Sequence, residues 1–190
     1  MSRQLETPRS RIPWPIIALV GLVALAVVAV LVALVAGSRP NPNAGTAQPD
    51  DGRAHIPNCS LGGYSSVPPT SGCHDGSPGS WGVYTAPAQE TQMIHNLEHG
   101  GIVIWYQPDQ LDAEQIGELE DYVNTQVQSN RFKVILAPWA GQDFEHPIAL
   151  TAWQYLLYQD TVDLGVIRDF VSIHYGDAPE PNGGPGPPAV

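Results

Sequence analysis

An unbroken apolar run at residues 16–36, IIALVGLVALAVVAVLVALVA, constrains this chain more than any other feature of its sequence. At about 1.5 Å of rise per residue, such a run spans roughly 30 Å as a helix, which is the thickness of a bilayer's hydrocarbon core. Trp14 precedes the run at the position typical of an interfacial aromatic residue. The sequence therefore predicts one transmembrane helix.

The basic residues near this helix predict its orientation. Arg3, Arg9 and Arg11 precede it, whereas only Arg39 and Arg53 follow it closely. The positive-inside rule then predicts a cytoplasmic tail at residues 1–15 and an extracytoplasmic remainder, in a single-pass protein of the cell membrane. The alternative is a cleaved signal peptide, but its apolar region is normally only about 7–15 residues long.

The charge distribution argues against one class of partner. Residues 37–190 carry five of the eight Lys and Arg residues and 18 of the 19 acidic ones, a formal charge near −13. Such a surface repels nucleic acid and attracts cations. The predicted partner is the membrane, through residues 16–36, with an unidentified protein of the cell envelope as a further possibility and no nucleic acid.

Composition divides the outer part of the chain into three. Residues 37–53 lack apolar periodicity and contain prolines, which predicts a flexible linker. Residues 177–190 are rich in Pro and Gly, which predicts a disordered tail. The folded domain is therefore expected at residues 54–176.

Periodicity predicts the elements of that domain. Apolar runs predict strands at 101–106, 132–137 and 148–153, and a shorter strand at 81–84. Asp112 and Gln115 form the pattern of a capping box at the start of a helix. A last helix is expected over about 161–175. Strands that alternate loosely with helices predict an α+β domain, with a mixed or antiparallel sheet and helices on one face.

The chain contains two cysteines, Cys59 and Cys73, both in the predicted outer part. An oxidising compartment favours a disulfide, and closing a loop of this length adds roughly 3 kcal/mol of stability. The alternative is that a thiolate binds a metal ion, because Cys73 lies beside His74.

Histidines gather between residues 74 and 99. His95 and His99 are four residues apart, so a helix would place them on one face, where they could bind one ion. His74, Glu98 and the thioether of Met93 are further candidate ligands. Imidazole with thioether suits copper, and zinc is the other candidate ion. The alternative is structural, with the histidines only bracing loops through hydrogen bonds.

Residues 95–99 also match the H-x-x-E-H pattern of inverted zinc proteases. That function requires the motif inside a long helix, with Glu98 as general base, yet Gly100 and Gly101 follow it directly. No nucleophile elbow or phosphate-binding loop is present. The sequence therefore favours a protein that is not an enzyme, and Glu98 is a catalytic candidate only in the hydrolase hypothesis.

Three stretches together resemble one bacterial family, the domain-of-unknown-function family 3105: PPTSGCH at 68–74, GVYTAP at 82–87 and HNLEHGG at 95–101. The resemblance covers about residues 55–176. It implies one N-terminal transmembrane segment followed by a compact outer domain, and it identifies His74, His95, Glu98 and His99 as motif positions without implying an activity. Cys73 stands where the family usually has proline, which supports a bridge to Cys59 that is particular to this sequence.

Overall fold

The apolar run forms a single helix, α1 (Trp14–Gly37), in a computed structural model that describes residues 13–37, 41–58 and 63–188. Within those residues, one helix is long and apolar enough to cross a membrane, and the qualifying segment is Trp14–Val32. Its large apolar side chains are exposed. This is what a membrane span requires, while its orientation stays a prediction. The chain divides into two units, residues 1–41 and 42–190, and each is described by itself.

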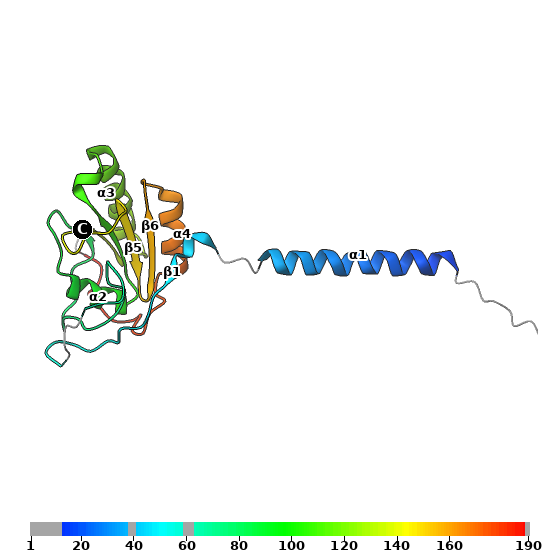
Figure 1. The fold of residues 1–190 in the computed structure, drawn as a ribbon, viewed down its shortest axis with the longest axis horizontal. Helices are drawn as coiled ribbons and strands as arrows, with labels where there is room; N and C mark the ends of the chain where they lie inside the picture. Colours follow the sequence, from blue (N-terminus) through cyan, green and yellow to red (C-terminus); the bar gives the residue numbers. More distant parts are fainter. Residues whose placement is uncertain (1–12, 38–40, 59–62, 189–190) are drawn as a thin grey trace, which may run out of the picture. The chain divides into compact units, whose positions relative to one another are not determined.

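A six-stranded mixed sheet forms the centre of the second unit (Figure 1). The strands run in the order β1-β6-β5-β3-β4-β2, and β4 is parallel to both β3 and β2 while the other pairs are antiparallel. Their bounds are β1 (Thr46–Ala47), β2 (Gly82–Val83), β3 (Ile102–Tyr106), β4 (Val134–Pro138), β5 (Ile148–Ala152) and β6 (Tyr155–Gln159). The predicted α+β class with a mixed sheet is confirmed.

Helices cover both faces of the sheet. Helices α3 (Ala113–Val127) and α4 (Leu164–His174) pack on one face, against Ile102 and Ile104 of β3. Helix α2 (Glu90–Glu98) packs on the other face, against Val103 and Trp105. In Figure 1, α4 and α2 lie on opposite sides of the β5–β6 hairpin. This differs from the expectation of helices on one face, because that expectation included no helix before β3.

The start of α3 follows directly from its sequence. The Asp112 carboxylate accepts a hydrogen bond from the Gln115 backbone N–H at 2.9 Å, and the Gln115 side chain accepts one from the Asp112 N–H at 3.0 Å. Leu119 and Val123 then lie one turn apart and are fully buried against the sheet. Local capping and helical spacing were therefore sufficient to predict this helix.

Part of the predicted linker belongs to the folded unit. A short 3₁₀ helix, η1 (Pro42–Ala44), is followed by β1, where Thr46 pairs with Leu156 of β6. The Ala44 carbonyl also accepts a hydrogen bond from the ring of His174 at 2.8 Å. These contacts depend on partners more than 100 residues away in the chain, so local composition gave no sign of them.

Candidate metal centre

Helix α2 carries buried polar side chains, and two of them, those of His95 and Glu98, lie at one position. Met93, Ile94 and Leu97 face the apolar cluster against the sheet, and His95 and Glu98 are buried as well. The helix ends at Glu98, and Gly100 follows with a φ of +75°. A Cβ on Gly100 would lie 2.6 Å from the Gly176 Cα, so the close approach of two backbone segments also requires glycine there.

Two more histidines reach the same position from the irregular segment before β2. The backbones of residues 54–56 and 74 pair like parallel strands: the His74 N–H donates to the Ala54 carbonyl, and the Ile56 N–H donates to the His74 carbonyl. This pairing places the His55 and His74 rings 4.7 Å apart, measured between centroids. His74 is fully buried, whereas the side chain of His55 is 47% exposed. His55 thus lies where the group meets solvent.

Four side chains then share one small volume. Ligand atoms of His55, His74, His95 and Glu98 all lie within 4.8 Å of one another. The Glu98 Oε2 is 3.1 Å from the His74 Nε2 and 3.8 Å from the His55 Nε2. We call this set the His–Glu group. His99 lies beside it, with its Nε2 2.9 Å from the Nε2 of His95.

Backbone carbonyls fix the tautomers of three rings. The Nδ1 atom of His74 lies 2.8 Å from the Gly72 carbonyl oxygen. The Nδ1 atom of His95 lies 2.6 Å from the Asp75 carbonyl oxygen, and that of His99 lies 3.0 Å from the Glu180 carbonyl oxygen. A carbonyl oxygen can only accept a hydrogen bond, so each Nδ1 carries the proton. Each neutral ring therefore directs a bare Nε2 lone pair away from its carbonyl partner. Metal-binding histidines are oriented in this way in proteins.

These lone pairs face other acceptors. The bare Nε2 of His95 faces the bare Nε2 of His99, and the bare Nε2 of His74 faces a Glu98 oxygen. Burial lowers the pKa of His95, and the neighbouring rings of His99, His74 and His55 lower it further, which favours the neutral form. Each close contact therefore needs an added cation, either a metal ion or a shared proton.

The C-terminal segment covers His99. Besides the Glu180 carbonyl on the His99 ring, the Glu180 N–H donates to the Glu98 carbonyl at 3.0 Å. The Lys133 ammonium donates to the carbonyls of His99, Pro181 and Gly183. Residues 177–188 are thus held by hydrogen bonds, which differs from the disordered tail expected from composition. Glycine is required at one point of this contact, because a Cβ on Gly183 would lie 2.3 Å from the His99 ring.

The other predicted site residues are placed as follows. Met93 lies in the apolar cluster between α2 and the sheet, where a Cβ on Gly79 would lie only 2.4 Å from its terminal methyl group. Cys59 lies outside the described residues, so its bridge to Cys73 stays a prediction. The His–Glu group contains His74 but not its neighbour Cys73.

Sequence reasoning missed His55. It is the second residue of the predicted domain and lies 19 positions before His74, in a segment without regular secondary structure. Only the backbone pairing of residues 54–56 with 74 brings the two rings together. The one available signal was that His55 lies just after residue 53, where the Pro-containing composition of the predicted linker ends.

Comparisons with known proteins agree with this layout. A family model described as "Protein of unknown function (DUF3105)" matches residues 55–185. The match begins at His55 and ends beyond Glu180, so it includes every residue of the site described above. No curated protein and no solved structure matches the chain at a significant level.

Proposed function

We propose that this chain, which belongs to the DUF3105 family of proteins of unknown function, binds a divalent transition-metal ion through the His–Glu group. The observation that carries the proposal is the orientation of the three rings. Each donates its Nδ1 proton to a backbone carbonyl and leaves its Nε2 bare inside a buried cluster. Protein interiors rarely leave buried acceptors facing one another, and a cation removes the conflict.

The distances support one ion. With metal–nitrogen bonds near 2.0–2.1 Å, two ligands of the same ion lie roughly 2.9–4.2 Å apart. Within the group, the pairs His74–Glu98 at 3.1 Å and His55–Glu98 at 3.8 Å fall in that range. The contact of His95 with His99, which lies outside the group, is 2.9 Å. The ligand atoms of the group lie at most 4.8 Å apart, so any pair near that limit would have to move slightly closer together to bind the same ion. His99 is suitably placed to join as a further ligand beside His95.

The donor atoms favour zinc or Cu(II). The His–Glu group offers imidazole nitrogens and a carboxylate, which suit both ions, whereas Cu(I) prefers the soft sulfur of Met or Cys. Met93 packs among apolar side chains, so a Met93→Leu variant should keep its full metal content. A loss of copper in that variant would make the thioether a ligand after all.

Metal analysis tests the proposal directly. The full-length chain, purified in detergent and dialysed against Zn²⁺ or Cu²⁺, should retain about one ion, and the His95→Gln and His74→Gln variants should retain far less. His146→Gln is the matched control, because that ring pairs with Asp160 at 2.7 Å and belongs to no part of the group. Circular dichroism of each variant establishes that it is folded. Equal metal content in the wild type and both site variants would overturn the proposal.

The leading alternative is a structural or protein-interaction domain without metal. Its support is that the same carbonyl contacts fix residues 72–75 and the C-terminal segment to α2, with shared protons in place of an ion. The zinc-hydrolase hypothesis has less support. Glu98 is 1% exposed and already contacts His74, and the motif lies at the end of a nine-residue helix.

The proposed location is the outer face of the cell membrane, with α1 as the anchor. The length and apolar surface of α1 support the anchor, and the arginines before residue 16 support a cytoplasmic N-terminus.

A further inference from the structure

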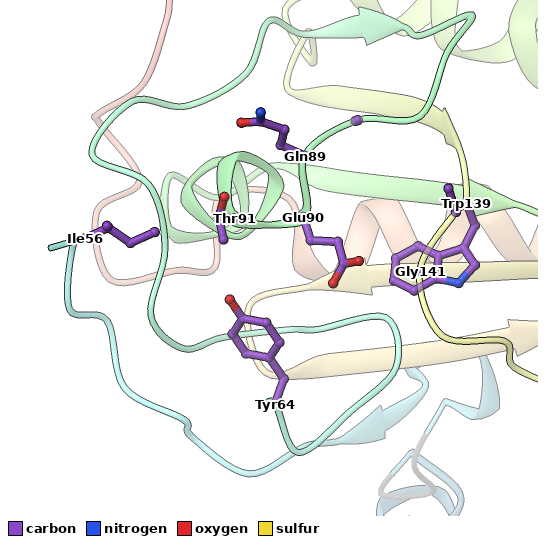
Figure 2. A pocket seen from close by; sticks show the side chains of 9 residues that line it. Ile56, Tyr64, Gln89, Glu90, Thr91, Trp139 and Gly141 are labelled. Carbon is purple, nitrogen blue, oxygen red and sulfur yellow. The ribbon is translucent and has the colours of Figure 1, made fainter. Parts of the chain in front are cut away.

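A pocket of about 550 Å³ opens beside the N-terminus of α2, at the opposite end of that helix from Glu98. Its walls include the rings of Tyr64 and Trp139, the backbone of Gly141 and the carboxylate of Glu90 (Figure 2). None of its lining residues belongs to the His–Glu group. The pocket is therefore a second candidate site whose chemistry must be argued separately.

Glu90 is the charged residue among those that line the pocket. Figure 2 shows its carboxylate directed between the Tyr64 ring and the Trp139 indole. Within the described residues it forms no ion pair, and burial alone raises its pKa, without an opposing hydrogen bond or cation. A half-buried carboxylate in this state is stabilised by any cation that enters the pocket.

The aromatic walls have their polar atoms already satisfied. The Tyr64 hydroxyl donates to the Cys73 carbonyl at 2.7 Å, and the Trp139 indole N–H donates to the Gln142 carbonyl at 2.9 Å. Burial raises the pKa of the Tyr64 hydroxyl, and the negative charge of Glu90 raises it further. The Glu90 carboxylate and the Tyr64 side chain therefore interact electrostatically across the pocket. What remains for a ligand is the π-surface of two rings next to one negative charge.

We propose that this pocket binds an alkylammonium group, with Glu90 as its counter-ion and Tyr64 and Trp139 as aromatic walls. Aromatic faces attract organic cations, and the attraction grows when the cation leaves water. The lining favours an organic cation over a metal ion, because Glu90 is its one charged ligand group and the rings of Tyr64 and Trp139 supply no strong metal ligand. The pocket is large enough to admit a small amine or the side chain of a partner's lysine, and the acidic domain attracts either one.

Calorimetry with n-butylammonium chloride tests the proposal on the full-length protein in detergent. Butylammonium should bind, and 1-butanol, which has a similar length but no charge, should not. Glu90→Gln should weaken binding at least about tenfold, as expected when a desolvated counter-ion is lost. Glu114→Gln is the matched control, because Glu114 also lies in the first turn of a helix but is exposed and is not among the residues that line the pocket.

A second variant blocks the space instead of removing the charge. A Cβ on Gly141 would lie 2.5 Å from Trp139 Cζ2 and 2.6 Å from Glu90 Oε1, so Gly141→Ala should also abolish binding. Equal binding of butanol, or unchanged butylammonium binding in both variants, would overturn the proposal. N-acetyl-lysine methylamide distinguishes the sources: tighter binding than butylammonium assigns the site to a protein lysine, and weaker binding assigns it to a small amine. Metal content should be unchanged in Glu90→Gln, so the two proposals can fail separately.

Discussion

The Nε2 atoms of His95 and His99 lie 2.9 Å apart, and each of these rings has already donated its Nδ1 proton to a backbone carbonyl. Two neutral rings in this arrangement repel through their lone pairs, because neither nitrogen has a proton to offer the other. The contact therefore needs a cation between the two rings, and this requirement leads to the first prediction.

Metal binding should stabilise the folded protein. An ion that binds the native state alone adds about 2.7 kcal/mol when its concentration is 100 times its dissociation constant. Thermal unfolding of the full-length chain should therefore shift upward with Zn²⁺ or Cu²⁺ and downward with EDTA. His146→Gln should shift by the same amount, and His74→Gln should not shift. Identical curves with metal and with EDTA for the wild type would argue for a metal-free cluster.

Glu98→Gln separates metal binding from structural bracing. The amide N–H₂ of glutamine can donate to the bare Nε2 of His74, which now faces a carboxylate oxygen at 3.1 Å. Without metal, the variant should therefore be at least as stable as the wild type. With metal, it should bind at least about tenfold more weakly, because a neutral amide is a poorer ligand than a carboxylate. Calorimetric titration and urea unfolding measure the two effects.

The C-terminal segment should be necessary for the site. A Cβ on Gly183 would lie 2.3 Å from the His99 ring, so Gly183→Ala must displace either the ring or the segment. We expect a loss of about 1–3 kcal/mol in unfolding free energy and weaker metal binding. Gly186→Ala is the control, because a Cβ there meets no atom within 4 Å. Equal stability of the two variants would mean that residues 177–188 do not hold His99 in solution.

The stability of the domain should fall with acid through His174. Burial lowers the pKa of this ring, whose Nε2–H donates to the Ala44 carbonyl while its buried Nδ1 has no partner in the described residues. The unfolded state then binds a proton below the ordinary histidine pKa of 6.5, whereas the folded state resists it. The contribution of His174 to the free energy of unfolding is therefore fully present above pH 6.5. Below pH 6.5 it decreases by at most about 1.4 kcal/mol per pH unit.

His174→Gln should make the pH dependence of stability shallower. Glutamine can still donate to the Ala44 carbonyl, but it does not titrate. Urea unfolding of both proteins at pH 7 and at a pH one unit below 6.5 gives the comparison, with His146→Gln as a control. A variant that loses as much stability on acidification as the wild type would assign the effect to other groups.

Intact mass distinguishes an anchor from a cleaved signal. If α1 remains, the 190-residue chain expressed with this sequence should be recovered from the membrane fraction with the mass of that sequence, about 20.4 kDa. Removal of a signal peptide would delete the apolar run and release the remainder into the soluble fraction. Mass spectrometry of both fractions measures this directly.

Local sequence signals predicted the elements that depend on local physics. The capping box of Asp112 and Gln115 and the buried run of β3 are readable from a few neighbouring residues. Strand β6 was missed because the turn before it, at Trp153 and Gln154, contains no Gly, Asn or Pro, although Gln154 takes a positive φ of 61°. The predicted strand at 148–153 therefore matched β5 alone, and residues 155–159 were assigned to no element.

The sequence predicted the part of the candidate site that residues 74–99 supply, including His74. The four-residue spacing of His95 and His99 indicated a common helical face, and in the structure α2 contains His95 and Glu98 while His99 is its C-cap residue. His55 and the Glu180 carbonyl reach the site through long-range backbone contacts, and neither has a local pattern. Met93 illustrates the opposite case, because helical spacing alone cannot tell a buried core side chain from a ligand.

The carbonyl that holds His99 is 81 residues further along the chain, close to the end of the domain. During synthesis, His55, His74, His95 and Glu98 emerge from the ribosome well before Glu180 does. The nascent chain can thus present its imidazoles before the last one is oriented. If the His–Glu group binds an ion and the domain is extracytoplasmic, as proposed, metal loading should follow translation and export, in the compartment where the finished domain resides.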